Sequence, residues 1–97
     1  MYALEIKPGA ESDIQQLRPF ERSRVVDAIR SRIADQPQRE SRNRKSLTGD
    51  FPGHDEVWEY RLGDLRIFYD VDEEAHLVRI QAVRRKRSDQ RTQDIFP

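Results

Sequence analysis

The chain has 97 residues, a balanced charge of 18 basic and 18 acidic side chains, and no cysteine. This predicts one domain over residues 1–97 with a single thin core, and it excludes a disulfide framework or a thiolate metal site. The two histidines are too far apart in sequence to suggest zinc, no apolar run approaches the ~20 residues of a membrane span, and the N-terminus has no signal-peptide core, so we expect a cytoplasmic protein without membrane contact.

The first third of the chain predicts one strand and two helices. Residues 2–7 alternate apolar and polar and predict a strand. The apolar spacing of residues 10–17 predicts a short helix, which ends before Pro19 because the residue before a proline avoids the α region. Pro19 also suits the first position of a second helix, which ends before Pro37. That helix has one apolar stripe: Val25, Val26, Ile29 and Ile33.

The charges are unevenly distributed. Residues 39–48 and 84–91 are basic, whereas residues 50–74 between them are acidic. Residues 38–53 are also polar and rich in turn formers, which predicts a surface loop or a partly ordered excursion. Arginine greatly outnumbers lysine, and guanidinium groups bind phosphate or carboxylate groups through two parallel hydrogen bonds. We therefore predict binding to nucleic acid or to an acidic partner; the alternative is a merely solvated surface.

Residues 57–71 predict a β-hairpin, in which two alternating runs flank the two-residue turn Gly63–Asp64. Side chains alternate between the faces of a strand. One face of the hairpin then carries Trp58, Tyr60, Leu62, Leu65, Ile67 and Tyr69. On the other face Arg61 lies directly opposite Arg66, and such like charges repel. This arrangement predicts a bound anion there, unless Glu59 and Asp70 on the same face neutralise the arginines.

An acidic turn at residues 72–74 leads into a last strand over roughly residues 75–83, in which Val78, Ile80 and Ala82 alternate with polar neighbours. The layout is β-α-α-β-β-β. It predicts an α+β fold: a mainly antiparallel, twisted, four-stranded sheet with two N-terminal helices packed on one face. The helices must cover the apolar face of the hairpin, so the arginines point to the open face.

The hairpin also carries a family resemblance. Residues 58–69, with a Gly-Asp-x-Arg-hydrophobic-x-Tyr core at Gly63–Tyr69, resemble the RelE/ParE toxin superfamily, as do the chain length, the order of elements and the upstream Lys45–Gly49. The resemblance implies a RelE-like fold and a toxin of a bacterial type II toxin–antitoxin pair, neutralised by a small cognate antitoxin. One branch consists of endoribonucleases that cut mRNA on the ribosome, and the other poisons DNA gyrase.

For the nuclease branch, the resemblance implies a site on the open face that uses no metal and no other cofactor. There the 2′-OH of the RNA attacks the adjacent phosphate, which needs a proton acceptor, cations and a proton donor. The resemblance implies four catalytic residues: Lys45, Arg61, Arg66 and Arg85. The neighbouring basic side chains are expected to bind RNA or phosphate: Arg44, Arg84, Lys86 and Arg87. Phe68 and Arg42 are expected antitoxin contacts, with base stacking as the alternative for Phe68.

The chain departs from the nuclease pattern after the last strand. RelE-like nucleases often carry a tyrosine or histidine there, but residues 84–91 contain neither. Lys45 or Lys86 with a lowered pKa, or His54, would have to transfer the proton. We expect a metal-independent, ribosome-dependent mRNA endoribonuclease. The alternatives are a gyrase poison without nuclease activity and an inactive member that serves only as the partner of an antitoxin.

Overall fold

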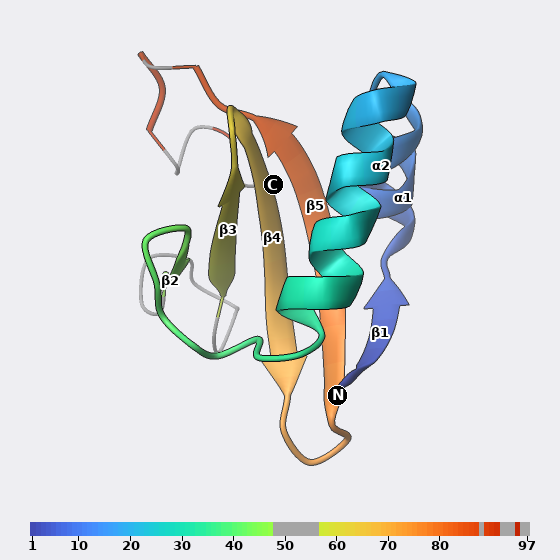
Figure 1. The fold of residues 1–97 in the computed structure, drawn as a ribbon, viewed down its shortest axis with the longest axis vertical. Helices are drawn as coiled ribbons and strands as arrows, with labels where there is room; N and C mark the ends of the chain where they lie inside the picture. Colours follow the sequence, from blue (N-terminus) through green and yellow to red (C-terminus); the bar gives the residue numbers. More distant parts are fainter. Residues whose placement is uncertain (48–56, 88, 92–94, 96–97) are drawn as a thin grey trace.

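In a computed structural model of the chain, the described residues, 1–47, 57–87, 89–91 and 95, form a five-stranded sheet with two helices against one face (Figure 1). The strands are β1 (Ala3–Ile6), β2 (Arg44–Ser46), β3 (Trp58–Leu62), β4 (Leu65–Asp72) and β5 (Leu77–Arg85). The helices are α1 (Pro8–Gln15) and α2 (Pro19–Ala28), and a π-helical turn, η1 (Ile29–Ile33), continues α2. α2 begins at Pro19, as the sequence predicts, whereas α1 begins at Pro8, two residues before the first apolar position of the predicted helix.

The strand order is β1-β5-β4-β3-β2, with β1 parallel to β5 and all other neighbours antiparallel. The predicted α+β class and the placement of the helices on one face are confirmed. The sheet has one strand more than the four predicted, because β2 forms within the stretch expected to be a loop. Three residues are too few for alternation to reveal a strand. β2 pairs with β3 through Arg44–Tyr60, Lys45–Glu59 and Ser46–Trp58.

The predicted hairpin register is confirmed. Gly63 has the positive φ of 62° that the two-residue turn requires, a backbone conformation that glycine adopts without steric cost. Arg61 therefore lies opposite Arg66. The flanking pairs are Trp58–Tyr69, Tyr60–Ile67 and Leu62–Leu65.

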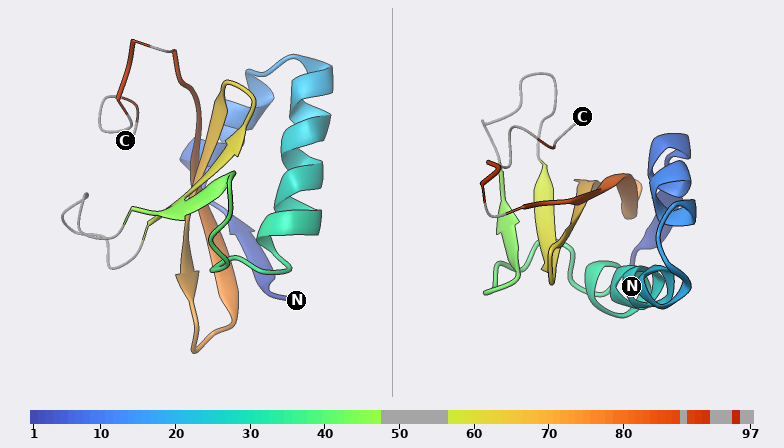
Figure 2. Two further views of the ribbon diagram at one scale, coloured as in Figure 1. Left: turned by 60° about the vertical axis from the view of Figure 1, so that its left-hand side comes forward. Right: turned by 90° about the horizontal axis from the view of Figure 1, so that it is seen from above.

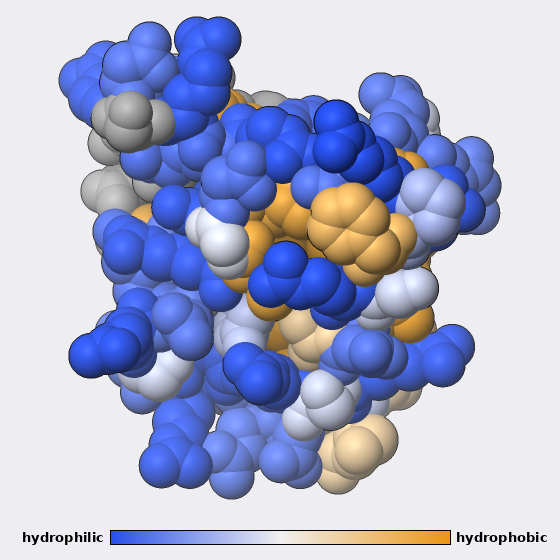
Figure 3. All heavy atoms as spheres, turned by 45° about the horizontal axis from the view of Figure 1, so that its top comes forward, coloured by the Kyte–Doolittle hydropathy of each residue, from blue (hydrophilic) through white to orange (hydrophobic). Residues whose placement is uncertain are grey.

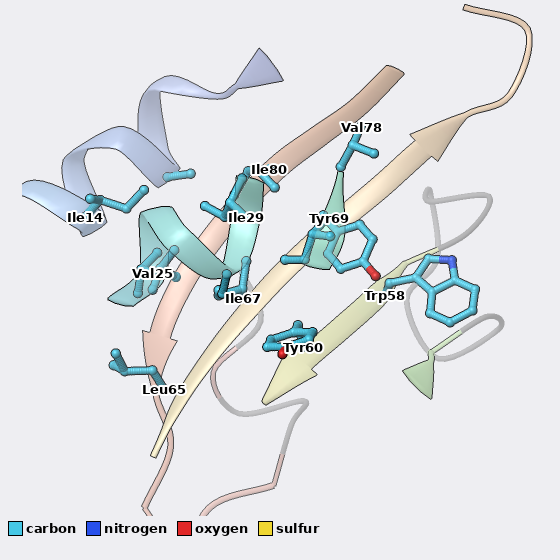
Figure 4. Close-up of a cluster of buried hydrophobic side chains, with 14 residues drawn as sticks. Ile14, Val25, Ile29, Trp58, Tyr60, Leu65, Ile67, Tyr69, Val78 and Ile80 are labelled. Atoms are coloured by element: carbon cyan, nitrogen blue, oxygen red, sulfur yellow. The ribbon is translucent and has the colours of Figure 1, made fainter. Parts of the chain in front are cut away.

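The main core lies between the helices and the sheet. Figure 4 shows Ile14, Val25 and Ile29 from the helical layer beside Ile67 and Ile80 from β4 and β5. All five side chains are buried. The apolar face of the hairpin therefore docks on the helices, and the other face of the sheet is left for a site.

A β-bulge interrupts the alternation of β5. Phe68 pairs with Ala82 and Tyr69 pairs with Ile80, so Gln81 is an extra residue on β5. The bulge moves Ala82 to the face that carries Phe68, while Val83 joins the main core. The prediction that Ala82 shares a face with Ile80 is therefore wrong. β5 also continues to Arg85, two residues beyond its predicted end.

A second, smaller apolar cluster lies on the face of the sheet opposite the helices. Its members are Leu47, Val57, Phe68, Ala82 and Ile95. Ile95 comes from the C-terminal tail, whose described residues lie on the side of the sheet away from the helices (Figure 2). Phe68 is fully buried in this cluster. The prediction of an exposed Phe68, available to an antitoxin or a base, is therefore wrong, because the tail and the chain around β2 cover it.

Candidate functional site

Three arginines lie in one row across the sheet. Arg61 on β3 pairs with Arg66 on β4, which in turn pairs with Arg84 on β5. The guanidinium of Arg66 donates from Nη1 to the carbonyl oxygens of Gly63 and Leu65, at 2.8 and 2.9 Å, and its buried Nε has no hydrogen-bond partner. Arg66 is thus a cation on the middle strand of the row. It contacts backbone oxygens and forms no ion pair with a carboxylate of the described chain.

Arg61 has a carboxylate beside it. Its Nε lies 3.3 Å from Oε1 of Glu59, whose side chain is 0% exposed, whereas that of Arg61 is 45% exposed. The second predicted counterion, Asp70, instead accepts hydrogen bonds from Arg79 at 2.8 Å and from Gln81 at 2.5 Å. The alternative that carboxylates neutralise the arginine pair is therefore correct for Arg61, whose partner is Glu59. Asp70 neutralises neither arginine of the pair.

Arg84 and Arg85 both form ion pairs with the helical layer. Arg84 binds the carboxylate of Asp13 on α1, and the same carboxylate accepts the backbone N–H of Val83 at 3.0 Å. Arg85 lies in register with Leu65, on the helix side of the sheet, and binds Glu21 at 2.9 Å and Asp64 at 2.7 Å. The structure therefore does not bring Arg85 together with Arg61 and Arg66 on the open face.

The contacts of Arg85 explain three pKa shifts. Hydrogen bonds from its guanidinium hold the pKa of Glu21 and the pKa of Asp64 below their ordinary values, and these hydrogen bonds raise the pKa of Arg85 itself. Arg85 joins the hairpin turn to the start of α2. This gives it a structural role that the sequence did not reveal, because its two partners are far from it along the chain.

The basic residues of β2 lie on opposite faces. Lys45 is exposed and lies opposite Glu59, on the open face. Arg44, at 6% exposed, lies over the Tyr60 ring at 5.5 Å and donates from Nη2 to the carbonyl oxygen of Arg32 at 2.7 Å. Arg44 therefore does not join the open-face cations, which corrects its expected place among them. Arg42 is exposed in the turn before β2, as expected for a contact residue.

The remaining basic candidates lie just beyond β5. Lys86 is half-buried, and its backbone N–H donates to the carbonyl oxygen of Asp64 at 2.8 Å. Arg87 is exposed and forms an ion pair with Asp89 at 3.3 Å. Of the residues expected to bind RNA or phosphate, Arg84 and Arg87 thus have acidic partners within the chain.

No tyrosine or histidine lies on the open face beside Arg61 within the described part of the chain. The Tyr60 hydroxyl accepts from Arg32 at 2.8 Å, which raises the pKa of that arginine, and the Tyr69 hydroxyl donates to Pro37 at 2.6 Å. Both tyrosines belong to the main core. The remaining candidates, Tyr2 and His76, stack on each other with their ring centroids 3.7 Å apart. The Tyr2 hydroxyl donates to Glu73, which raises the pKa of Tyr2. His54, the third expected proton carrier, lies outside the described residues.

The helix side of the sheet holds a basic cleft that the sequence did not indicate. One part, of about 410 Å³, is lined by residues that include Arg24, Arg32 and Arg61. An adjoining part, of about 300 Å³, is lined by residues that include Arg39 and Arg44. The two parts share Ser31, Arg32 and Asn43. The sequence concealed this cleft because its arginines come from three separate segments.

Two classes of feature are missing from the part of the chain that the structure describes. It holds no group of three or more side chains of histidine, aspartate or glutamate placed to share a metal ion. Neither of its helices has the length and apolar character that a membrane crossing requires.

Solved structures similar to this one are toxins and toxin–antitoxin complexes. The toxin–antitoxin complex RelBE2 from Mycobacterium tuberculosis contains a chain that is 25% identical, with a TM-score of 0.73 over 88% of this chain and 98% of that one. The isolated RelE toxin from E. coli is 18% identical, with a TM-score of 0.71 over 92% and 89% of the two chains. The archaeal RelE–RelB complex from Pyrococcus horikoshii is 21% identical, with a TM-score of 0.66 over 92% and 98%. The latter two show the fold alone.

The family assignment comes from the sequence. No curated protein matches the chain significantly. Residues 4–90, which include both helices and all five strands except the first residue of β1, match the family described as ParE toxin of type II toxin–antitoxin system, parDE. The match includes the hairpin with its facing arginines. The chain therefore belongs to the ParE toxin family, within the RelE/ParE superfamily of type II toxin–antitoxin toxins.

Proposed function

We propose that this toxin acts by binding its target rather than by cutting RNA, as the superfamily resemblance implies for ParE-like poisons of DNA gyrase. The observation that carries the proposal is the composition of the open face. Arg61 and Arg66 provide positive charge there, but no tyrosine or histidine accompanies them in the described residues. RNA cleavage by the 2′-OH needs groups that accept and donate protons, whereas binding needs only the cations.

The surroundings of Arg61 support the same proposal. The buried carboxylate of Glu59 lies beside the guanidinium that a scissile phosphate would need. A negative charge at that place repels a phosphorane, on which further negative charge develops. The family match, whose description names parDE, also supports the gyrase branch.

The second candidate is the ribosome-dependent mRNA endonuclease. One observation favours it: Lys45, Arg61 and Arg66 are cations on strands that neighbour one another in the sheet. On the ribosome, orientation of the substrate by the A site can contribute ~7–11 kcal/mol to lowering the barrier, which reduces what the protein itself must supply. This candidate uses Lys45 or Lys86 as the proton carrier.

Under either candidate, we propose that a cognate antitoxin neutralises the toxin and that both act in the cytoplasm. The solved relatives include complexes of a toxin with its antitoxin. The family description names the same pairing.

The test compares the two targets directly. Purified toxin is added to programmed ribosomes, and the 5′ ends of the mRNA are mapped; in parallel, it is added to DNA gyrase with plasmid DNA, and cleaved gyrase–DNA complexes are measured. We expect the mRNA to stay intact and cleaved gyrase–DNA complexes to accumulate, and we expect the antitoxin to prevent this accumulation. Cleaved mRNA that persists under chelation by EDTA, with intact ribosomes and unaffected gyrase, would establish the nuclease instead. Arg66→Gln toxin is the negative control in both arms.

A further inference from the structure

We propose that the basic cleft on the helix side of the sheet is a second anion site, which binds a ligand with two or more phosphate groups. The cleft runs between the helical layer and the β2–β3 edge of the sheet, because Arg24 and Ser31 come from α2 and η1 whereas Arg44 and Arg61 come from the strands. It is separate from the open-face row, to which only Arg61 is common.

Four of the five arginines of the cleft form no ion pair with a carboxylate of the described residues, unlike the arginines of β5. Arg79, Arg84, Arg85 and Arg87 each form an ion pair. In contrast, no ion pair links a carboxylate of the described residues to the four other arginines of the cleft, Arg24, Arg32, Arg39 and Arg44. Like charges gathered without counterions repel, so a bound anion would stabilise this arrangement.

Two of these arginines are held in place before any ligand arrives. Arg32 donates from Nη1 to the Tyr60 hydroxyl at 2.8 Å, and its carbonyl oxygen accepts from Nη2 of Arg44 at 2.7 Å. Arg44 is more than nine-tenths buried, yet its Nε has no hydrogen-bond partner. Side chains fixed in this way lose little further freedom on binding, which favours a pre-organised site.

The composition of the cleft indicates phosphate rather than an apolar or mixed ligand. Its lining is five arginines against two aspartates, Asp27 and Asp35, with Ser31 and Asn43 where its two parts meet. Ala28 and Leu62 are its only aliphatic side chains among the described residues. A protein partner would need apolar pockets for anchoring side chains, whereas phosphate groups need guanidinium forks and hydrogen-bond donors.

The dimensions of the cleft fit such a ligand as well. The face of the molecule shown in Figure 3 is mostly hydrophilic, with a smaller apolar area inside it. The two adjoining cavities, of about 410 and 300 Å³, provide room for successive phosphate groups. Such groups occur in a single-stranded nucleic acid backbone and in a free polyphosphate, which competition between RNA and tripolyphosphate distinguishes.

The test measures binding of a fluorescein-labelled single-stranded RNA to the folded toxin by anisotropy, with inorganic tripolyphosphate as competitor. Arg24→Gln and Arg32→Gln should each weaken binding about tenfold or more, the scale of one lost charge-assisted hydrogen bond. The matched control is Arg30→Gln, because Arg30 is exposed on η1 and lines neither part of the cleft. Arg66→Gln removes a cation of the open face and measures how much of the RNA binding that face contributes. Arg24 forms no hydrogen bond or ion pair with the described residues, so its variant should fold normally even if the Arg32 variant does not.

The outcomes distinguish the ligand sources. RNA binding that depends on Arg24 and is displaced only weakly by tripolyphosphate would identify a nucleic acid backbone. Tight tripolyphosphate binding with the same dependence, but no RNA binding, would identify a free polyphosphate. Equal losses in Arg24→Gln and Arg30→Gln would overturn the proposal, as would binding of an oligoglutamate peptide without any binding of phosphate ligands. Loss of RNA binding in Arg66→Gln alone would assign the binding to the open face and would also overturn it.

Discussion

Arg61 and Arg66 lie directly opposite each other on β3 and β4, but only Arg61 has a carboxylate beside it. Arg66 donates instead to two backbone carbonyl oxygens near the hairpin turn. A backbone carbonyl carries only a partial charge, so the positive charge of Arg66 remains available to an anionic target. This asymmetry makes Arg66 the more informative of the two positions.

Arg66→Ala should abolish growth arrest after induction of the toxin, and Arg61→Ala should weaken it. Each change removes a charge-assisted contact to the target, which we expect to reduce affinity about tenfold or more. The measurement is growth after induction, together with thermal melting of each purified variant. Arg30→Ala is the control, because Arg30 is exposed on the helical layer. Full toxicity of both variants, or their unfolding, would contradict an open-face site. Glu59→Ala would not be a suitable control, since that side chain is fully buried.

The second apolar cluster makes Phe68 a core residue. Phe68→Ala should lower the free energy of unfolding by about 3–5 kcal/mol, the usual cost of removing a buried phenylalanine side chain. Phe20 provides the matched control, because its side chain is 58% exposed and Phe20→Ala should change stability little. Urea-induced unfolding measures both. Equal effects of the two variants would mean that Phe68 is not enclosed by the tail and β2.

The ion pairs of Arg85 predict a pH dependence of stability. The folded state lowers the pKa of Glu21 and the pKa of Asp64 because Arg85 hydrogen-bonds to their ionised forms. Their contribution is therefore present above the ordinary carboxyl pKa of about 4, and it is lost as the pH falls through the lowered values. Arg85→Gln should be less stable than the unaltered chain near pH 7, and the difference should vanish once the pH has fallen below the lowered pKa values of both carboxyl groups.

Urea-induced unfolding across this pH range tests the prediction. Arg87→Gln is the matched control, because Arg87 and its partner Asp89 are both largely exposed and such a pair contributes little. A stability difference between Arg85→Gln and the unaltered chain that stays constant down to low pH would show that Arg85 acts through packing rather than through its carboxylates.

Charge pairing within the chain should also determine which arginines attract the antitoxin. Arg42→Ala should slow antitoxin association at low salt, because Arg42 is exposed and forms no ion pair within the described chain. Arg84→Ala should have less effect, since Asp13 already neutralises Arg84. Stopped-flow association rates at several salt concentrations provide the measurement. Rates that do not depend on salt would exclude electrostatic steering by these residues.

The amino-acid sequence by itself determined the local features of this protein. The two-residue turn at Gly63–Asp64 and the alternation on either side of it specified the hairpin register, and with it the pair Arg61–Arg66. Pro19 marked the start of the second helix, and apolar spacing indicated the face that packs on the sheet. These features depend on residues close together in the chain, where geometry follows directly from residue type.

Only the tertiary structure decided the rest, because each remaining feature joins residues that are distant in sequence. The bulge at Gln81 shows only in the pairing of β5 with β4, and it moves Ala82 beneath Phe68. Arg84 reaches Asp13 across 71 positions of sequence, which gives this arginine of the row an acidic partner, and Arg85 reaches Glu21 across 64 on the helix side of the sheet. The composition of a segment can show that arginines are abundant. Whether each arginine contacts a carboxylate, contacts an aromatic ring or lines a cleft depends on which strands and helices the fold brings side by side.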